Sequence, residues 1–154
     1  MKIYLAARYS RRLELCGYRE QLQALGHVVT SRWLDGSHQI SDSGQPIGEH
    51  GEALAEGDDG SNSEAAANLR TLFAQEDLED VKAADLLVAF TEPPRSTASR
   101  GGRHVEFGVA LGMGKLLLVI GYRENIFCWL PGVEFLPTWD CAMAALFEAA
   151  AQAS

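Results

Sequence analysis

Glu106 is the residue of this sequence whose type and position most strongly suggest chemistry. It follows a loop rich in Gly, Ser and Arg at the start of a predicted helix, and the apolar run before that loop, Leu86–Phe90, predicts a strand. Ligands of α/β sheets bind beyond the carboxyl ends of strands and against helix N-termini. A carboxylate there can act as a nucleophile or general base. The alternative is a carboxylate that only stabilises the first helical turn through the macrodipole.

Two loops that follow predicted strands could bind an anion. One comes after Lys2–Ala6 and the other immediately precedes Glu106. Guanidinium groups and the free amides of a helix start bind phosphate, and glycines let a ligand approach the backbone closely. The alternative is a solvated basic turn that offsets nearby acids. The candidate binding residues are Arg8, Ser10, Arg11, Arg12, Ser99, Arg100, Gly101 and Gly102.

Five acidic residues precede the strand that leads to Glu106. Most of their carboxylates should lie on a solvated helix face. If one of them reached the cleft, it would complete the pair of carboxyl groups that glycosidic chemistry uses, one as nucleophile and one to handle a proton. These residues are Glu76, Asp77, Glu79, Asp80 and Asp85.

Two other patterns carry little weight. The acids and histidines at His38, Glu49, His50 and Glu52 have no compact spacing, so we expect no metal site. Gly108–Lys115 only superficially resembles a phosphate-binding loop, because it leads from helix into strand and Leu116 stands where Ser or Thr is required.

Length and composition are those of one globular domain, which we assign to residues 1–154. The formal charge of −8 disfavours binding to nucleic-acid polymers. The three cysteines form no CxxC pair, which predicts reduced thiols and a cytoplasmic protein. Apolar runs such as Leu116–Ile120 are far shorter than the ~20 residues of a membrane helix, so we expect no membrane association.

Apolar strands alternate with helices along the chain. The predicted strands are Lys2–Ala6, His27–Trp33, Leu86–Phe90, Leu116–Ile120 and Glu134–Leu136. The predicted helices are Arg11–Leu25, a helix that starts at Glu64 with Ser63 as N-cap, its continuation or a second helix at Asp77–Ala84, Arg103–Met113 and Thr138–Ala151, with a helical turn at Ile126–Leu130. The polar stretch from Asp35 to Asn62 has no periodic apolar signal and predicts a flexible insertion or a lid.

This alternation predicts an α/β fold with a doubly wound, flavodoxin-like (Rossmann-like) sheet. The sheet should have five mainly parallel strands with helices on both faces. The loops Ala7–Arg12 and Thr91–Arg103 should then face each other across one cleft. Asp77 should lie at the opposite end of the third strand, unless the segment before that strand folds back.

Several segments match a known family when they are taken together. They are Lys2–Ala6, Glu76–Phe90, Gly102–Lys115 and, more weakly, Phe135–Asp140. The specific features are an acid, Asp77, eight positions before Asp85 and the pattern Gly-x-x-x-Glu-x-Gly from Gly102. With these features, most of the chain outside the insertion resembles the nucleoside 2-deoxyribosyltransferase superfamily, which includes the 2′-deoxynucleoside 5′-phosphate N-hydrolases.

The resemblance implies cleavage or transfer of the N-glycosidic bond of a 2′-deoxynucleoside or its 5′-monophosphate. Glu106 matches the family's nucleophile, which forms a glycosyl-enzyme ester. Asp77 matches the acid that assists the leaving base, and Tyr4 matches the tyrosine that holds Glu106. The reaction requires no metal or organic cofactor, so we expect none. Arg100, together with the Arg8–Arg12 loop, favours a substrate with a 5′-phosphate.

The resemblance also implies that a neighbouring subunit closes the substrate end of the site. The matching segment contributes Asn125, Phe127 and Trp129, and its apolar character suits a partner. We therefore expect a homodimer or a higher homo-oligomer. Two other functions stay open: a non-catalytic nucleotide-binding or sensing domain, and an NAD glycohydrolase.

Overall fold

The computed structural model describes residues 1–36, 64–94 and 101–152. The predicted insertion beyond Gly36, the N-cap Ser63 and the loop residues Ser99 and Arg100 lie outside the described residues. Among the helices that are described, none is long and apolar enough to cross a membrane.

A five-stranded sheet forms the centre of the molecule, as predicted. Its order is β2-β1-β3-β4-β5 and every neighbouring pair is parallel, which is the flavodoxin-like arrangement. The strands are β1 (Lys2–Ala6), β2 (Val28–Val29), β3 (Leu86–Phe90), β4 (Leu116–Ile120) and β5 (Val133–Leu136). All five residues of β3 are buried, because a central parallel strand is covered on both faces.

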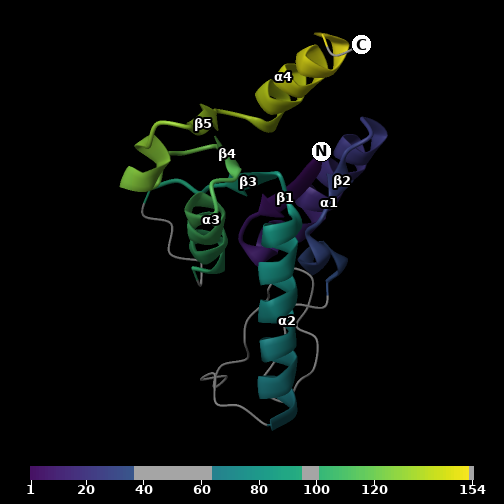
Figure 1. Cartoon of the computed structure of the whole chain (residues 1–154), viewed down its shortest axis with the longest axis vertical. Coiled ribbons are helices and arrows are strands. Elements are labelled where there is room, and N and C mark those ends of the chain that lie inside the picture. The colour runs from purple at the N-terminus through teal and green to yellow at the C-terminus, as the bar shows by residue number, and fades with distance from the viewer. Residues whose placement is uncertain (37–63, 95–100, 153–154) are drawn as a thin grey trace.

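Helices lie on the two faces of the sheet, and the last helix of the chain extends away from it (Figure 1). On one face, α1 (Arg12–Ala24) lies against α4 (Trp139–Gln152), where Trp139 stacks on Tyr18 with ring centroids 4.4 Å apart. On the other face, α2 (Glu64–Ala83) packs beside α3 (Gly102–Gly112). Short 3-10 turns complete the described chain: η1 (Tyr9–Arg11), η2 (Arg32–Asp35) and η3 (Ile126–Trp129). The helical turn predicted near residue 126 is therefore present.

Helix α2 resolves the placement of Asp77. It is one continuous helix from Glu64 to Ala83, and it packs against α3, η2 and β1. Asp77 lies six residues before the end of α2, which corresponds to about 9 Å along the helix. From this position the charge of Asp77 interacts with Tyr4, and the charge of Glu106 acts on Asp77.

The second strand is shorter than predicted. The sequence predicts a strand over His27–Trp33, but β2 contains only Val28 and Val29 and is followed by η2. Beyond Thr30, side chains instead of the backbone form the hydrogen bonds to β1. The Leu5 N–H donates to Ser31 Oγ at 2.7 Å, and Trp33 Nε1 donates to the Leu5 carbonyl at 2.9 Å. The side chains of Ser31 and Trp33 thus bond to the backbone of β1 without extending the strand.

Candidate active site

Glu106 and Tyr4 meet on the face of the sheet that α2 and α3 cover. The Tyr4 hydroxyl donates a hydrogen bond of 2.8 Å to Glu106 Oε1. Tyr4 is fully buried in β1, and Glu106 stands one turn into α3, whose first turn contains no acid. The helix macrodipole acts mainly within the first turn. Stabilisation of the helix start therefore does not explain Glu106, whereas its contact with Tyr4 does.

The environment of Glu106 keeps its carboxyl group close to its titration point at neutral pH. Burial raises the pKa of Glu106 to about 7, while the Tyr4 hydrogen bond and the positive charge of Arg103 act to lower it. The pKa of Tyr4 is raised well above its usual value, chiefly by burial and then by the charge of Glu106. Tyr4 is thus a neutral phenol at physiological pH and can donate its proton to the hydrogen bond.

The charge of Asp77 interacts with those of Glu106 and Tyr4. Burial is the largest cause that raises the pKa of Asp77 to about 7, and the negative charge of Glu106 is the next. The charge of Asp77 in turn contributes to the raised pKa of Tyr4. Asp80 of the same cluster also contributes to the raised pKa of Tyr4, but Asp77 is the acid whose own pKa the charge of Glu106 raises. Near neutral pH such a pair of carboxyl groups shares about one proton.

Asp80 has a structural position that the sequence did not reveal. It is buried at 6% exposure, and it accepts hydrogen bonds from the Arg32 backbone N–H at 2.9 Å and from Arg32 Nε at 2.8 Å. Asp80 thereby fastens η2 to α2, one turn after Asp77. The other acids have different surroundings: Glu76 and Glu79 face Arg32, and Asp85 accepts from the Lys2 N–H.

The loops after β1 and β3 face each other, as the fold predicted. Arg11 Nη1 donates to the Thr91 carbonyl at 3.4 Å and lies 3.5 Å from Glu92 Oε1. Arg8 Nε lies 3.6 Å from the same oxygen of Glu92. Arg11 also binds both carboxylate oxygens of Glu14, at 2.8 and 2.7 Å. The sequence did not single out Glu92 or Glu14, because only the fold places them beside these arginines.

The remaining candidates for anion binding do not converge on one point. Arg12 Nη1 donates to the Leu34 carbonyl at 2.8 Å, so this guanidinium group faces η2. Ser10 is exposed in η1. Gly101 precedes α3 with φ of 86°, a conformation that favours glycine, and Gly102 is the first residue of the helix. The predicted contribution of this loop to ligand binding stays a prediction, since Ser99 and Arg100 are outside the described residues.

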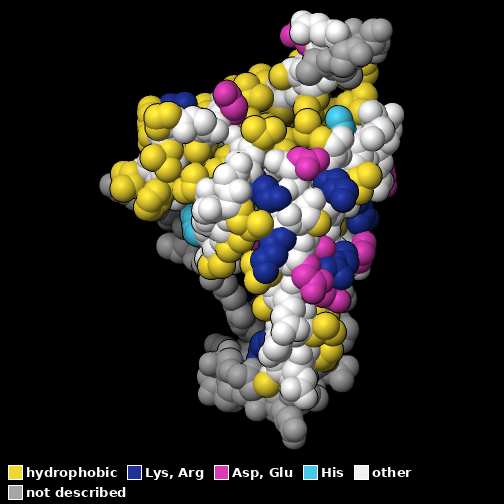
Figure 2. All heavy atoms as spheres, in the orientation of Figure 1, with side chains coloured by type: hydrophobic (Ala, Val, Ile, Leu, Met, Phe, Trp, Pro, Cys, Tyr) yellow, Lys and Arg dark blue, Asp and Glu magenta, His cyan; other side chains and the backbone are white. Residues whose placement is uncertain are grey.

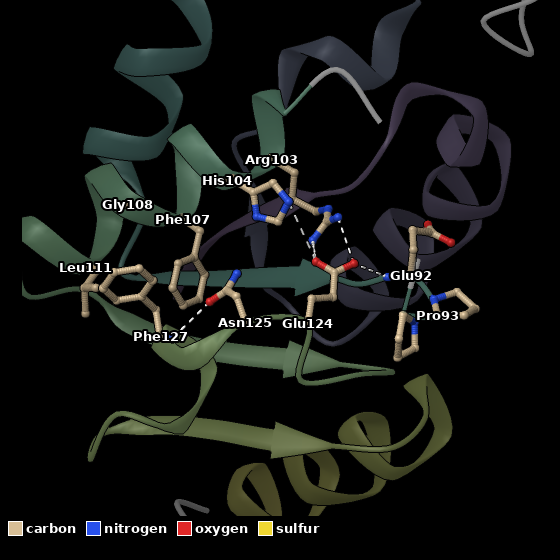
Figure 3. Close-up of a pocket in the computed structure, with 11 residues that line it drawn as sticks. Glu92, Pro93, Arg103, His104, Phe107, Gly108, Leu111, Glu124, Asn125 and Phe127 are labelled. Carbon is tan, nitrogen blue, oxygen red and sulfur yellow. Dashed lines mark hydrogen bonds and ion pairs between the residues drawn. The ribbon is translucent and has the colours of Figure 1, made fainter. Parts of the chain in front are cut away.

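A separate pocket of about 580 Å³ lies on another side of α3 (Figure 3). Its apolar wall includes Phe107, Leu111 and Phe127, and Glu106 is not among the lining residues. At its polar end Glu124 accepts hydrogen bonds from both terminal nitrogens of the buried Arg103 and from the Glu92 N–H. This ion pair holds the first turn of α3 and the residue after Thr91 together.

The segment predicted to reach a neighbouring subunit is strongly exposed. Asn125 Oδ1 accepts from the Phe127 N–H at 2.9 Å and so caps η3. Phe127 is 54% exposed, Trp129 is 66% exposed and Ile126 is 78% exposed. An apolar surface covers this part of the molecule in Figure 2. In the described part of the chain, no hydrogen bond or ion pair joins this segment to Glu106.

No metal site is apparent in residues 1–36, 64–94 and 101–152, where no three His, Cys, Asp or Glu side chains group as metal ligands. His38 and the acids near His50 lie outside these ranges. The described site thus consists of carboxyl groups, a phenol and guanidinium groups. With these groups it can exchange protons and supply a carboxylate nucleophile.

Solved structures with a similar fold include proteins from three organisms. A 2-deoxyribosyltransferase from Bacillus psychrosaccharolyticus is 21% identical, with a TM-score of 0.61, over 93% of this chain and 90% of that chain. A 2-deoxyribosyltransferase from Leishmania mexicana is 17% identical, with a TM-score of 0.55, over 96% and 97%. A CMP N-glycosidase from Clostridium botulinum is 19% identical, with a TM-score of 0.51, over 95% and 98%.

No protein-family model and no curated protein sequence matches this chain. The three structural matches cover nearly the whole chain, and all three proteins belong to the nucleoside 2-deoxyribosyltransferase superfamily. The resemblance predicted from the sequence is therefore confirmed at the level of the fold: this chain has the α/β fold of the nucleoside 2-deoxyribosyltransferase superfamily.

Proposed function

We propose that this protein is an enzyme that cleaves or transfers the N-glycosidic bond of a 2′-deoxynucleoside or its 5′-monophosphate. The observation that carries the proposal is the partly buried hydrogen bond from Tyr4 to Glu106, with Asp77 close enough for its charge to interact with both. The shared fold supports the same reaction class, since the structural matches are two 2-deoxyribosyltransferases and a CMP N-glycosidase.

The surroundings of the two carboxyl groups suggest different roles for them. Glu106 receives a hydrogen bond from Tyr4 and feels the charge of Arg103, and both favour its ionised form. Ionised Glu106 then raises the pKa of Asp77 and favours its protonated form. We therefore assign Glu106 as the nucleophile and Asp77 as the proton donor, which is the division of labour in retaining glycosidases.

The proposed reaction has two displacement steps. In the first, a Glu106 oxygen bonds to C1′ of the sugar while the C1′–N bond breaks, and the electron pair of that bond goes to the base nitrogen. The Asp77 proton neutralises the departing base. In the second step, water or another base attacks C1′ and breaks the ester to Glu106, and a proton from the attacking group returns to Asp77. Tyr4 keeps the Glu106 carboxylate aimed at the sugar throughout.

We further propose that the exposed segment with Asn125, Phe127 and Trp129 closes the site of a second copy of the chain. Its support is the exposure of the apolar side chains of Phe127 and Trp129 in η3. Monomeric proteins rarely expose large contiguous apolar patches. The functional unit would then be a homodimer or a higher homo-oligomer.

Base release from 2′-deoxynucleosides and their 5′-monophosphates, followed by chromatography, tests the function. Each substrate is incubated with and without a free acceptor base. Release without acceptor identifies a hydrolase, and exchange only with acceptor identifies a transferase. Glu106→Gln should lower kcat by a factor on the order of 10³ or more, because the nucleophile is lost. NAD is included as a substrate, since cleavage of NAD alone would contradict the proposal.

Unchanged turnover in Glu106→Gln would also contradict the proposed mechanism. The matched control is Glu134→Gln, which makes the same change at an exposed position on β5. A Glu106→Gln protein that denatures at a temperature no lower than that of the parent protein shows that the loss of activity is chemical and not structural.

A further inference from the structure

Arg32 is a basic residue that the mechanism above does not use. It is the first residue of η2, the turn that follows β2. Its guanidinium group reaches three acids of α2: Nε lies 2.8 Å from Asp80 Oδ1, Nη2 lies 3.1 Å from Glu79 Oε2, and Nη1 lies 3.8 Å from Glu76 Oε1. Nη2 also donates to the Glu76 carbonyl at 3.2 Å. One side chain thus contacts residues of the helix both before and after Asp77.

The backbone of η2 fixes Arg32 in this place. The Arg32 N–H donates to Asp80 Oδ2 at 2.9 Å, so the same carboxylate binds both the main chain and the side chain of Arg32. The residues on either side, Ser31 and Trp33, bond through their side chains to the backbone of Leu5 in β1. Arg32 is therefore held between β1, which carries the tyrosine of the candidate site, and α2, which carries its second acid.

The charges that reach Asp77 have opposite signs. Burial raises the pKa of Asp77 most, and three negative charges add to this effect. They are the charges of Glu106 on α3 and of Asp80 and Glu76 on α2. Arg32 on η2 supplies a positive charge that lowers the pKa of Asp77. The side chain that contacts the acids beside Asp77 therefore also offsets their effect on it.

Different residues act on the other carboxyl group of the site. Burial raises the pKa of Glu106, while the Tyr4 hydrogen bond and the charge of Arg103 lower it. Tyr4, on the third element that packs against α2, is itself a neutral phenol at physiological pH and adds no charge. Arg103 on α3 thus has the relation to Glu106 that Arg32 on η2 has to Asp77.

We propose that Arg32 is a positioning residue for the proton donor: its guanidinium group holds the turn of α2 that carries Asp77 and balances the negative charge of the acids beside it. This inference rests on the proposed function. An acid that gives up a proton and takes one back works best when its pKa lies near the operating pH. Without Arg32, the neighbouring carboxylates would make Asp77 hold its proton more tightly. The departing base would then receive that proton less readily.

Arg32→Gln tests this role through the pH–rate profile. The basic limb of kcat/KM, where activity falls as Asp77 loses its proton, should move to higher pH by roughly half a unit. The shift is modest because the Arg32 side chain is 44% exposed and solvent screens part of its charge. The acidic limb should move far less, since burial, Tyr4 and Arg103 control the pKa of Glu106.

Two further variants separate charge from structure. Arg32→Lys keeps the positive charge but cannot reproduce the forked contacts of a guanidinium group, and it should leave the basic limb near that of the parent protein. Arg19→Gln is the matched control, because Arg19 on α1 also pairs with an acid of η2, Asp35, at 2.8 Å. It should leave both limbs in place. Equal displacement of the basic limb in Arg32→Lys and Arg32→Gln would contradict charge balance.

A double variant keeps the test decisive if Arg32→Gln does not fold, since that change leaves the buried Asp80 carboxylate without its ion pair. Arg32→Gln combined with Asp80→Asn removes both charges of the pair. Because these charges act on Asp77 in opposite directions, the basic limb of the double variant should lie near that of the parent. Asp80→Asn alone should move the limb to lower pH, and a shift to higher pH would contradict the inference.

Direct titration of Asp77 separates this inference from the proposed function. Carboxyl-carbon NMR follows that titration in the parent protein and in Arg32→Gln, with or without turnover. A pKa of Asp77 that does not rise in Arg32→Gln overturns the role of Arg32, even if base release is observed. Lack of base release from every substrate overturns the proposed function, and the NMR titration then still decides whether Arg32 acts on Asp77.

Discussion

Tyr4 and Glu106 are separated by 102 positions in the sequence, yet the hydroxyl of one donates to the carboxylate of the other at 2.8 Å. This hydrogen bond links the middle of β1 to the second turn of α3 across the interior of the molecule. It also acts against the desolvation that raises the pKa of Glu106. Substitution of either residue should therefore change the pKa of Glu106 or remove its charge.

Tyr4→Phe should move the pH dependence of the reaction. Loss of the hydroxyl removes a contact that lowers the pKa of Glu106, so that pKa should rise above its present value of about 7. The acidic limb of kcat/KM should shift to higher pH, and kcat at neutral pH should fall by roughly 10- to 100-fold. The measurement is a pH–rate profile. Tyr18→Phe is the matched control, because it removes a hydroxyl that donates to Glu14 at 2.7 Å and should leave the limb in place.

Glu106→Gln should make the protein more stable at alkaline pH. The folded-state pKa of Glu106, about 7, lies above its ordinary value of 4.5, so the folded protein binds more protons than the unfolded chain between these values. The stability of the parent protein should therefore fall as pH rises through this window and level off above it. Glu106→Gln carries no charge at this position. Its free energy of unfolding at pH 8 should therefore exceed that of the parent protein by about 1–3 kcal/mol.

Urea denaturation at pH 8 and pH 5.5 measures this difference. The advantage of Glu106→Gln should be largest at pH 8 and should narrow at pH 5.5, where Glu106 is mostly protonated in the folded state. A constant or inverted difference would show that burial does not control the titration of this carboxyl group.

Asp77→Asn should slow the departure of the base. The pKa of Asp77 is raised to about 7, so its protonated form is available at neutral pH, and the amide cannot donate this proton to the base. We expect kcat to fall by roughly 10²- to 10⁴-fold with ordinary bases and by much less with a base that leaves readily as an anion. Steady-state kinetics with both kinds of substrate provides the measurement. Equal losses for the two substrates would rule out a proton-donor role.

Glu79→Gln is the control for that experiment. Glu79 is on the same helix, pairs with Arg32 at 3.1 Å and has an exposed side chain. Its replacement should leave the dependence of kcat on the leaving base unaltered.

Trp129→Ser should weaken self-association. Trp129 is 66% exposed beside Ile126 and Phe127, and burial of this surface is the expected driving force for assembly. Size-exclusion chromatography with light scattering, over a range of protein concentrations, should show a lower mass for Trp129→Ser than for the parent. Leu72→Ser, at a 46% exposed position on α2, should keep the parent's mass. A monomeric parent protein would contradict the proposed assembly.

The fold and much of the candidate site could be predicted from local patterns. Apolar runs of strand length that alternate with helical spacing give the parallel sheet, and the strand order is the one typical of a doubly wound sheet with five such strands. Because β1 and β3 are neighbours in this order, the loops that follow them face each other. The strand predicted over His27–Trp33 ends at Val29, because Ser31 and Trp33 bond to the Leu5 backbone through their side chains.

The sequence by itself determined the order and type of the elements, because apolar periodicity is a local property of the chain. Which charged side chains meet was decided only by the tertiary structure. Asp77 on α2 comes within range of the charge of Glu106 on α3 because the two helices pack together. Arg8 and Arg11 read as an open anion site until the fold placed Glu92 between them. Contacts of this kind depend on how helices are rotated and how side chains are oriented across distant segments, and no local pattern encodes either.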